Sequence, residues 1–215
     1  MSMPIEINLK DARQVALARL QDYLVEALVE VEPNIVIHGG TAIWRCYGGN
    51  RFSEDVDIYT NNIQIKKLHN YLTWALSKRG VRMDYPIGTV GTIIISDGFV
   101  HTKLEAMVPP RRLKSEQKEY ERINGSKFFI STLSIGNFIR EKASTYQKRR
   151  YIRDLYDLYH LVSIEKPDLG TRKILIEFLN SIEAPIDEGK LKDLVYTGVA
   201  PSFKTMIDYI SGRLE

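Results

Sequence analysis

Two aspartates separated by one residue, Asp55 and Asp57, are the part of the sequence best suited to chemistry. They lie at the start of a short run, residues 56–59, that has the composition of a strand. Residues two apart in a strand point the same way, so both carboxylates face one side, whereas Glu54 faces the other and is not expected to be a ligand. Hard oxygen ligands on one face suit Mg²⁺ or Mn²⁺. Two such ions, roughly 4 Å apart, would activate an acceptor hydroxyl and steady a leaving pyrophosphate.

A pair of glycines, Gly39 and Gly40, lies a short way upstream and is followed by Thr41. Without side chains the glycines would let a triphosphate approach the backbone. A helix expected from Thr41 to Tyr47 would then point free N–H groups at the phosphate, and the Thr41 hydroxyl is a further donor. An Asp-x-Asp pair alone also occurs in sugar transferases and in plain surface turns. The glycine pair nearby makes a nucleotide site the more specific interpretation.

A third carboxylate usually completes a two-metal site from a neighbouring strand. Glu105 is the best placed, in a strand expected over residues 99–107, with His101 and Lys103 on the same face by alternation. We therefore predict Asp55, Asp57 and Glu105 as metal ligands. Whether Glu105 is this third carboxylate stays open at this point.

The stretch from Arg140 to Arg153 contains six Lys or Arg residues against one Glu, with two tyrosines between them. Such a basic, aromatic-interleaved face could contact the phosphates of a nucleotide or of RNA, and the alternative is a solvated face of salt bridges. Asp154 and Asp157 follow three residues apart, and pairing with Arg150 or Arg153 is favoured for them over metal ligation. Four residues share one face if the stretch is helical: Lys142, Tyr146, Arg149 and Arg153.

Hydrophobic periodicity and turn residues indicate the elements that must position these residues. These patterns predict an α/β (α+β) fold, in which a mixed sheet with flanking helices is followed by a C-terminal helical lobe. The predicted boundary places the catalytic core in residues 1–130 and the lobe in residues 131–215. Residues 111–124 are expected to be a solvated loop or short surface helix, after Pro109-Pro110 closes the sheet region. Helices are expected over 9–31, 41–47, 65–79, 135–162 (as two helices or one bent one), 171–182 and 202–210, and strands over 35–37, 56–59, 92–95 and 99–107.

Length and composition limit the classes of protein that fit these motifs. The chain has 215 residues, 44% of them hydrophobic, which is enough for one sizeable core and a second small lobe. A single cysteine, Cys46, excludes an intrachain disulfide and fits a reducing compartment. Because the first residues lack an apolar signal region and no stretch approaches roughly 18 apolar residues, we expect a cytoplasmic protein without membrane insertion. A formal charge of +3 is too mild to establish nucleic-acid binding.

Together the motifs resemble the AbiEii-type nucleotidyltransferases, toxins of toxin-antitoxin systems within the polymerase-beta-like nucleotidyltransferase superfamily. The segment GGTAIWRCYGGNRFSEDVDIY looks like the family's Gly-Gly-Thr-Ala helix followed by Arg-x-Ser-x-Asp-x-Asp. Residues 140–143 and 153–159 look like its lysine-bearing helix and its Arg-Asp-hydrophobic-Tyr-Asp motif. The two motifs occur in the family's order.

The resemblance implies a nucleotidyltransferase that moves a nucleoside monophosphate from NTP to RNA, such as the 3′ end of tRNA, and that has an antitoxin partner. A small-molecule or protein hydroxyl as acceptor, and a nucleotide-binding module without catalysis, are the alternatives. Matching positions imply these roles: Gly40 and Thr41 contact phosphate, Asp55 and Asp57 hold the metals, Lys142 binds the triphosphate, Asp154 supports the same pocket, and Arg51 and Ser53 brace the loop.

Overall fold

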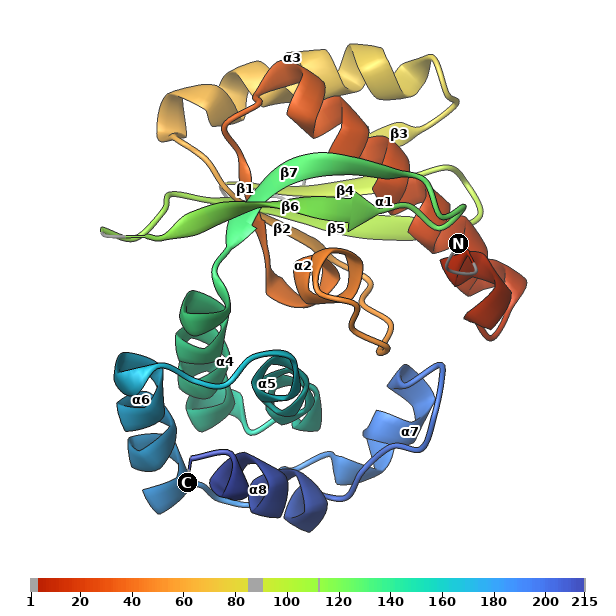
Figure 1. The fold of residues 1–215 in the computed structure, drawn as a ribbon. Coiled ribbons are helices and arrows are strands. Elements are labelled where there is room, and N and C mark those ends of the chain that lie inside the picture. Colours follow the sequence, from red (N-terminus) through yellow and green to blue (C-terminus); the bar gives the residue numbers. More distant parts are fainter. Residues whose placement is uncertain (1–3, 85–90, 112, 215) are drawn as a thin grey trace. The chain divides into compact units, whose positions relative to one another are not determined.

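The computed structural model describes residues 4–84, 91–111 and 113–214, and gives only the backbone of residues 62–67. It has the mixed α/β fold that the sequence predicts, and its sheet has seven strands, three more than expected (Figure 1). The elements follow in this order: a 3-10 turn Ile5–Asn8, α1 Ala12–Val31, β1 Val36–His38, α2 Gly39–Cys46, β2 Val56–Tyr59, α3 Asn62–Ser77, β3 Arg82–Asp84, β4 Thr92–Ser96, β5 His101–Met107, β6 Ser115–Glu121, β7 Lys127–Leu133, α4 Ile135–Arg149, α5 Ile152–Ile164, α6 Leu169–Asn180, a 3-10 turn Glu188–Lys190, α7 Leu191–Leu194 and α8 Phe203–Gly212.

The chain's own contacts divide it into two compact units. Unit 1 comprises residues 1–48 and 52–132, and unit 2 comprises residues 49–51 and 133–215. Unit 1 therefore contains the sheet, and unit 2 contains helices α4 to α8 together with three residues from the loop between α2 and β2. The assignment of residues 1–130 as the catalytic core and 131–215 as a helical lobe stays a prediction.

In unit 1 the strand order is β3-β4-β5-β2-β1-β7-β6. Strand β2 pairs in parallel with β5 and antiparallel with β1, so it has a hydrogen-bonded neighbour on each side. Its residues alternate as the sequence pattern requires, with Val56 and Ile58 buried and Asp57 half-buried. Helix α3 lies over one face of the sheet and α2 over the other (Figure 1). The two strands expected over residues 92–95 and 99–107 are also present as β4 and β5, which pair antiparallel.

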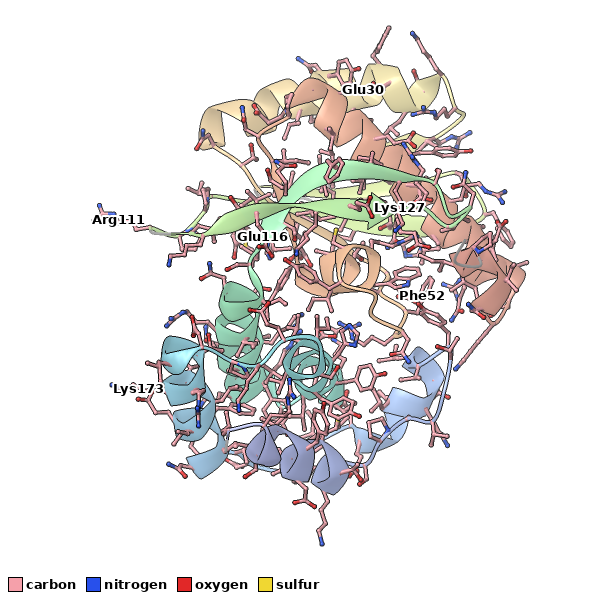
Figure 2. All side chains as sticks on the ribbon, viewed as in Figure 1. Glu30, Phe52, Arg111, Glu116, Lys127 and Lys173 are labelled. Carbon is pink, nitrogen blue, oxygen red and sulfur yellow. The ribbon has the colours of Figure 1, made fainter. Side chains whose placement is uncertain are left out.

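The expectation of a loop or short helix over residues 111–124 is wrong, and so is the closure of the sheet at Pro109-Pro110. Strand β6 forms within this range and β7 directly after it, and both belong to the sheet. Neither β7 nor the short strand β3 was predicted. Strand β6 lies at the edge of the sheet, where charged side chains are tolerated, so its hydrophobic alternation is weak. Two ion pairs lie on it: Lys118 pairs with Glu116, and Glu119 with Lys127 of β7. Glu116 and Lys127 are labelled in Figure 2.

In unit 2 the predicted helical stretch over residues 135–162 forms two helices, α4 and α5. They separate at Arg150, whose φ of 51° places it in the left-handed region and ends α4. The two helices pack through buried residues such as Phe138 and Leu155. Among the described residues, none of the helices is both long enough and apolar enough to cross a bilayer.

A buried ion pair ties α1, α2 and β6 together in unit 1. Arg45 Nη2 lies 3.2 Å from Asp22 Oδ1, and both side chains are buried. The carboxylate of Asp22 also accepts hydrogen bonds from the Tyr120 hydroxyl and from the backbone N–H of Ile123. Burial raises the pKa of Asp22, and the guanidinium of Arg45 opposes that rise. The pair is therefore a costly arrangement that remains favourable only while both partners are present.

Arg45→Met should lower the free energy of unfolding of unit 1 by about 3 to 5 kcal/mol, because it leaves the buried Asp22 without its cation. Both tryptophans, Trp44 and Trp74, lie in this unit, so urea denaturation followed by tryptophan fluorescence reports its unfolding. The control is Arg19→Met, which removes an exposed arginine 3.8 Å from Glu6 and should cost less than about 1 kcal/mol. Equal losses of unfolding free energy in the two variants would contradict the stabilising role of the Arg45–Asp22 pair.

Candidate active site

The carboxylates that the sequence singles out meet on one face of the sheet in unit 1. Asp57 of β2 and Glu105 of β5 are direct partners across the parallel ladder, so their side chains point the same way. Asp55 lies in the loop directly before β2. The ammonium of Lys103 is 2.7 Å from Glu105 Oε1 and 3.9 Å from Asp55 Oδ2. The structure thus brings the three predicted ligands into one neighbourhood around a single cation.

The electrostatics agree with that geometry. The pKa of Lys103 is raised, first by its hydrogen bond to Glu105, and then by the charges of Asp55, Glu105 and Asp57. Burial of the ammonium works in the opposite direction and is outweighed. All three carboxylates therefore act on one positive charge.

The donor set fits a divalent metal ion in chemical kind, because carboxylate oxygens are the ligands that Mg²⁺ prefers. In their present rotamers, the described side chains include no group of three His, Cys, Asp or Glu close enough to hold an ion. Lys103 nevertheless shows that two of the carboxylates already converge on a cation. The residues fit the group, and the assignment of Asp55, Asp57 and Glu105 as its ligands stays a prediction.

Gly39 makes room for one of these carboxylates. Its φ is +71°, and a Cβ atom at this position would overlap Oδ2 of Asp57. Helix α2 begins here, two residues before the predicted start at Thr41. The phosphate contacts predicted for Gly39 and Gly40 stay predictions. The observed reason for a glycine at position 39 is the close approach of Asp57.

The loop that carries the aspartates is fixed by its own backbone. The carbonyls of Ser53, Glu54 and Asp55 each accept a hydrogen bond from a different side chain of unit 1. From the sequence we expected Ser53 to brace this loop, but none of these three bonds was predicted, because the Thr41 hydroxyl was assigned to phosphate and the other two donors carry no motif. The donors, in the order of those carbonyls, are Gln21 of α1, Thr102 of β5 and Thr41 of α2.

The Thr41 hydroxyl is thus used inside the protein, and its side chain is fully buried. A contact of that hydroxyl with phosphate, as predicted, would require it to leave the Asp55 carbonyl. The backbone N–H groups at the start of α2 remain the donors most suited to an anion.

In unit 2 a second cluster joins five charged residues in an alternating chain. Arg51 donates two hydrogen bonds of 2.6 Å to Asp157. Lys142 Nζ lies 2.9 Å from Asp157 Oδ2 and 3.6 Å from Asp154 Oδ1. Arg149 completes the chain with bonds of 2.8 and 2.9 Å to Asp154. The cluster thus contains three cations and two carboxylates and has a surplus of one positive charge.

Burial would raise the pKa of Asp157, but Arg51 and Lys142 outweigh it and lower that pKa to about 2. Burial likewise opposes the charge on Arg51, yet Asp157 raises the pKa of that guanidinium. Both groups are therefore held in their charged forms. The predicted pairing of Asp154 and Asp157 with Arg150 and Arg153 is wrong in its partners, because Arg150 turns away at the helix end and pairs with Glu183.

Arg51 reaches Asp157 because residues 49–51 are built into unit 2. The backbone N–H of Tyr196 donates to the carbonyl of Asn50, and the Tyr196 hydroxyl donates to the carbonyl of Gly49. The side chain of Asn50 accepts from the Tyr156 hydroxyl and donates to the carbonyl of Thr197. Arg51 is thus held by an ion pair with a residue 106 positions away, and its role in bracing the loop stays a prediction.

The predicted basic face over Lys142, Tyr146, Arg149 and Arg153 does not form as one continuous surface. Lys142 and Tyr146 are buried, and the Tyr146 hydroxyl donates to the carbonyl of Glu183. The helix also breaks at Arg150, which ends the spacing on which the face depends.

Gly39→Ala and Gly48→Ala form a matched pair. Both place alanine at a positive φ, +71° and +64°, which costs about 1 to 2 kcal/mol. At Gly48 the added methyl meets no described atom within 4 Å, whereas at Gly39 it displaces Asp57. We expect Gly39→Ala to lower the free energy of unfolding by a further 1 to 3 kcal/mol or so, measured by urea denaturation with tryptophan fluorescence. Equal stability of the two variants would refute this role for Gly39.

Asp157→Asn should destabilise unit 2 by about 3 to 5 kcal/mol near neutral pH, because two buried cations lose their counter-ion. The folded pKa of about 2 lies below the ordinary value of 3.8, so the ionised carboxylate stabilises the fold above about pH 4. Its pH-dependent share, about 2 kcal/mol, is lost as the pH falls from about 4 towards 2.

Hydrogen exchange of α5 amides, compared between variant and wild type at each pH, measures this loss. The difference should shrink below about pH 4, and Asp208→Asn, an exposed change on α8, should give none. A difference that is independent of pH would show that Asp157 does not act through its charge.

Comparison with known proteins supports the family resemblance that the sequence motifs indicate. No curated protein matches. Among solved structures, ANT(2")-Ia in complex with adenylyl-2"-tobramycin is similar at 13% identity with a TM-score of 0.46, over 77% of this chain and 96% of that one. A likeness this low carries neither substrate nor mechanism. A family model described as "Nucleotidyl transferase AbiEii toxin, Type IV TA system" matches residues 22–195. The match covers most of the chain, so this protein belongs to the AbiEii nucleotidyltransferase family and is a nucleotidyltransferase.

Proposed function

We propose that the protein transfers a nucleoside monophosphate from NTP to RNA, with the 3′ end of tRNA as the favoured acceptor, and that it is the toxin of a toxin-antitoxin pair. The family match supports the toxin role and an antitoxin partner. The observation that carries the chemistry is the placement of Asp57 beside Glu105 in register, with Asp55 joined to Glu105 through Lys103.

In this proposal Asp55, Asp57 and Glu105 hold magnesium or manganese ions, which lower the charge barrier at the phosphate and favour the deprotonated acceptor. The acceptor hydroxyl oxygen forms a bond to the α-phosphorus, and the bond from that phosphorus to the β-phosphate oxygen breaks. Pyrophosphate leaves. The protein's part is positional, because strand pairing sets the spacing of Asp57 and Glu105, and Gly39 admits the Asp57 carboxylate.

Within unit 2, Lys142 would bind phosphate, and within unit 1 the N–H groups at the start of α2, from Gly39 to Thr41, are suited to phosphate. The surplus positive charge of the cluster around Lys142 supports this role. Asp154 fixes Lys142 and Arg149 and would act by positioning rather than by touching the nucleotide.

An RNA acceptor is supported by Tyr151, whose ring lies 5.3 Å from the guanidinium carbon of Arg149 and 5.6 Å from that of Arg153. An aromatic ring between arginines suits stacked bases and phosphates of a single strand. The paired charges of β6 and β7 instead favour the alternative, a small-molecule or protein hydroxyl as acceptor, because they leave no strong basic surface there.

The test is to incubate the purified protein with magnesium, total tRNA and each labelled NTP in turn. We expect label on tRNA, reduced on the order of 100-fold or more in Asp57→Asn, because the variant loses a metal-binding charge. Asp84→Asn, an exposed aspartate on β3 of the same sheet, is the matched control and should keep activity. NTP turnover without label on RNA would move the acceptor to a small molecule or a protein, and no turnover with any NTP would contradict the proposal.

The acceptor class is separated by a second variant. Arg111→Glu combined with Lys114→Glu reverses two exposed charges in the segment leading into β6. This variant should weaken transfer to RNA and make it more salt-sensitive, while transfer to a small acceptor should not change.

A further inference from the structure

Lys103 is a cation that the proposed reaction does not use. It stands two residues before Glu105 on β5, so both side chains project from the same face of the strand. Its ammonium reaches Glu105 at 2.7 Å and Asp55 at 3.9 Å. The side chain is 39% exposed, so it can move without disturbing the core.

Carboxylates gathered on one face repel one another, and a nearby opposite charge relieves the repulsion. The Lys103 ammonium supplies one compact charge and three N–H donors. A divalent ion in the same place would supply twice the charge and bind the oxygens directly. The two cations therefore compete for the same carboxylates.

The backbone beneath these side chains is set independently of Lys103. Asp57 and Glu105 are held in register by the β2–β5 ladder, and the Asp55 carbonyl accepts the Thr41 hydroxyl. Loss of the ammonium would therefore free carboxylate rotamers without removing the site. Competition, rather than preorganisation, should dominate the effect on metal affinity.

We propose that Lys103 is a positioning residue of the metal site, whose ammonium group holds Asp55 and Glu105 together in the metal-free protein and is displaced when a divalent cation binds. The inference rests on the proposed metal-dependent function. In this proposal Lys103 lowers the apparent affinity of the enzyme for divalent ions, because a metal ion must displace the ammonium group before it binds.

The test is Mn²⁺ binding to the EDTA-treated full chain, followed by the electron paramagnetic resonance signal of free Mn²⁺. Lys103→Met should bind Mn²⁺ roughly 30-fold more tightly, as expected for removal of one positive charge about 4 Å from a divalent ion in a solvated site. Lys103→Arg keeps the charge and should bind like the wild type. Lys118→Met is the matched control, because Lys118 is also 39% exposed on a strand and pairs at 3.6 Å with a glutamate two residues away.

Tighter binding in Lys103→Met alone supports the proposal. Equal or weaker binding in Lys103→Met, while wild type binds Mn²⁺ and Asp57→Asn does not, overturns this role of Lys103 and leaves the metal site intact. Absence of Mn²⁺ binding by the wild type overturns the metal site of the proposed function, and the inference with it. Circular dichroism melting of each variant in EDTA separates loss of binding from loss of fold.

Discussion

Carboxylates can share one face of a sheet only if the surrounding structure holds them against their mutual repulsion. In unit 1 this is achieved mainly through the backbone. The β2–β5 ladder fixes Asp57 opposite Glu105, and three successive carbonyls, from Ser53 to Asp55, are each bound by a side chain from a different element. The Asp57 carboxylate occupies the space that a side chain at Gly39 would need. The pairing of β2 with β5 and the glycine at the start of α2 both serve this requirement.

Unit 2 meets a related electrostatic requirement by a different route. Two of its carboxylates, Asp154 and Asp157, are buried, and a buried charge is costly unless it is paired. The alternating order of Arg51, Asp157, Lys142, Asp154 and Arg149 gives every anion two cations. Such a network is sensitive to geometry, because loss of one member leaves another charge buried and unpaired. The surplus cation is what makes the cluster suited to an anion such as a triphosphate.

The sequence predicts the parts of this structure that depend on local pattern. Alternation of Val56 and Ile58 with Asp57 predicts a strand and its exposed face, and the glycine pair predicts a helix start close to the carboxylates. The role of Gly39 was not predicted in its physical form, because a contact with Asp57 depends on tertiary placement. Strand β6 was missed because an edge strand can carry charges on both faces and then lacks a hydrophobic period. The pair of Arg51 with Asp157 was missed because no spacing rule relates residues 106 positions apart.

In the sequence, the stretch from Gly49 to Asp57 joins the charged cluster of unit 2 to the carboxylates of unit 1. Asn50 and Arg51 are fixed by bonds within unit 2, through Tyr196 and Asp157. Ser53 and Asp55, a few residues later, are fixed by bonds within unit 1. The motif Arg-x-Ser-x-Asp-x-Asp therefore begins with a residue held in unit 2, Arg51, and continues with residues held in unit 1, from Ser53 to Asp57. The arginine belongs to the motif because its charge satisfies Asp157, and the serine position because its carbonyl accepts Gln21.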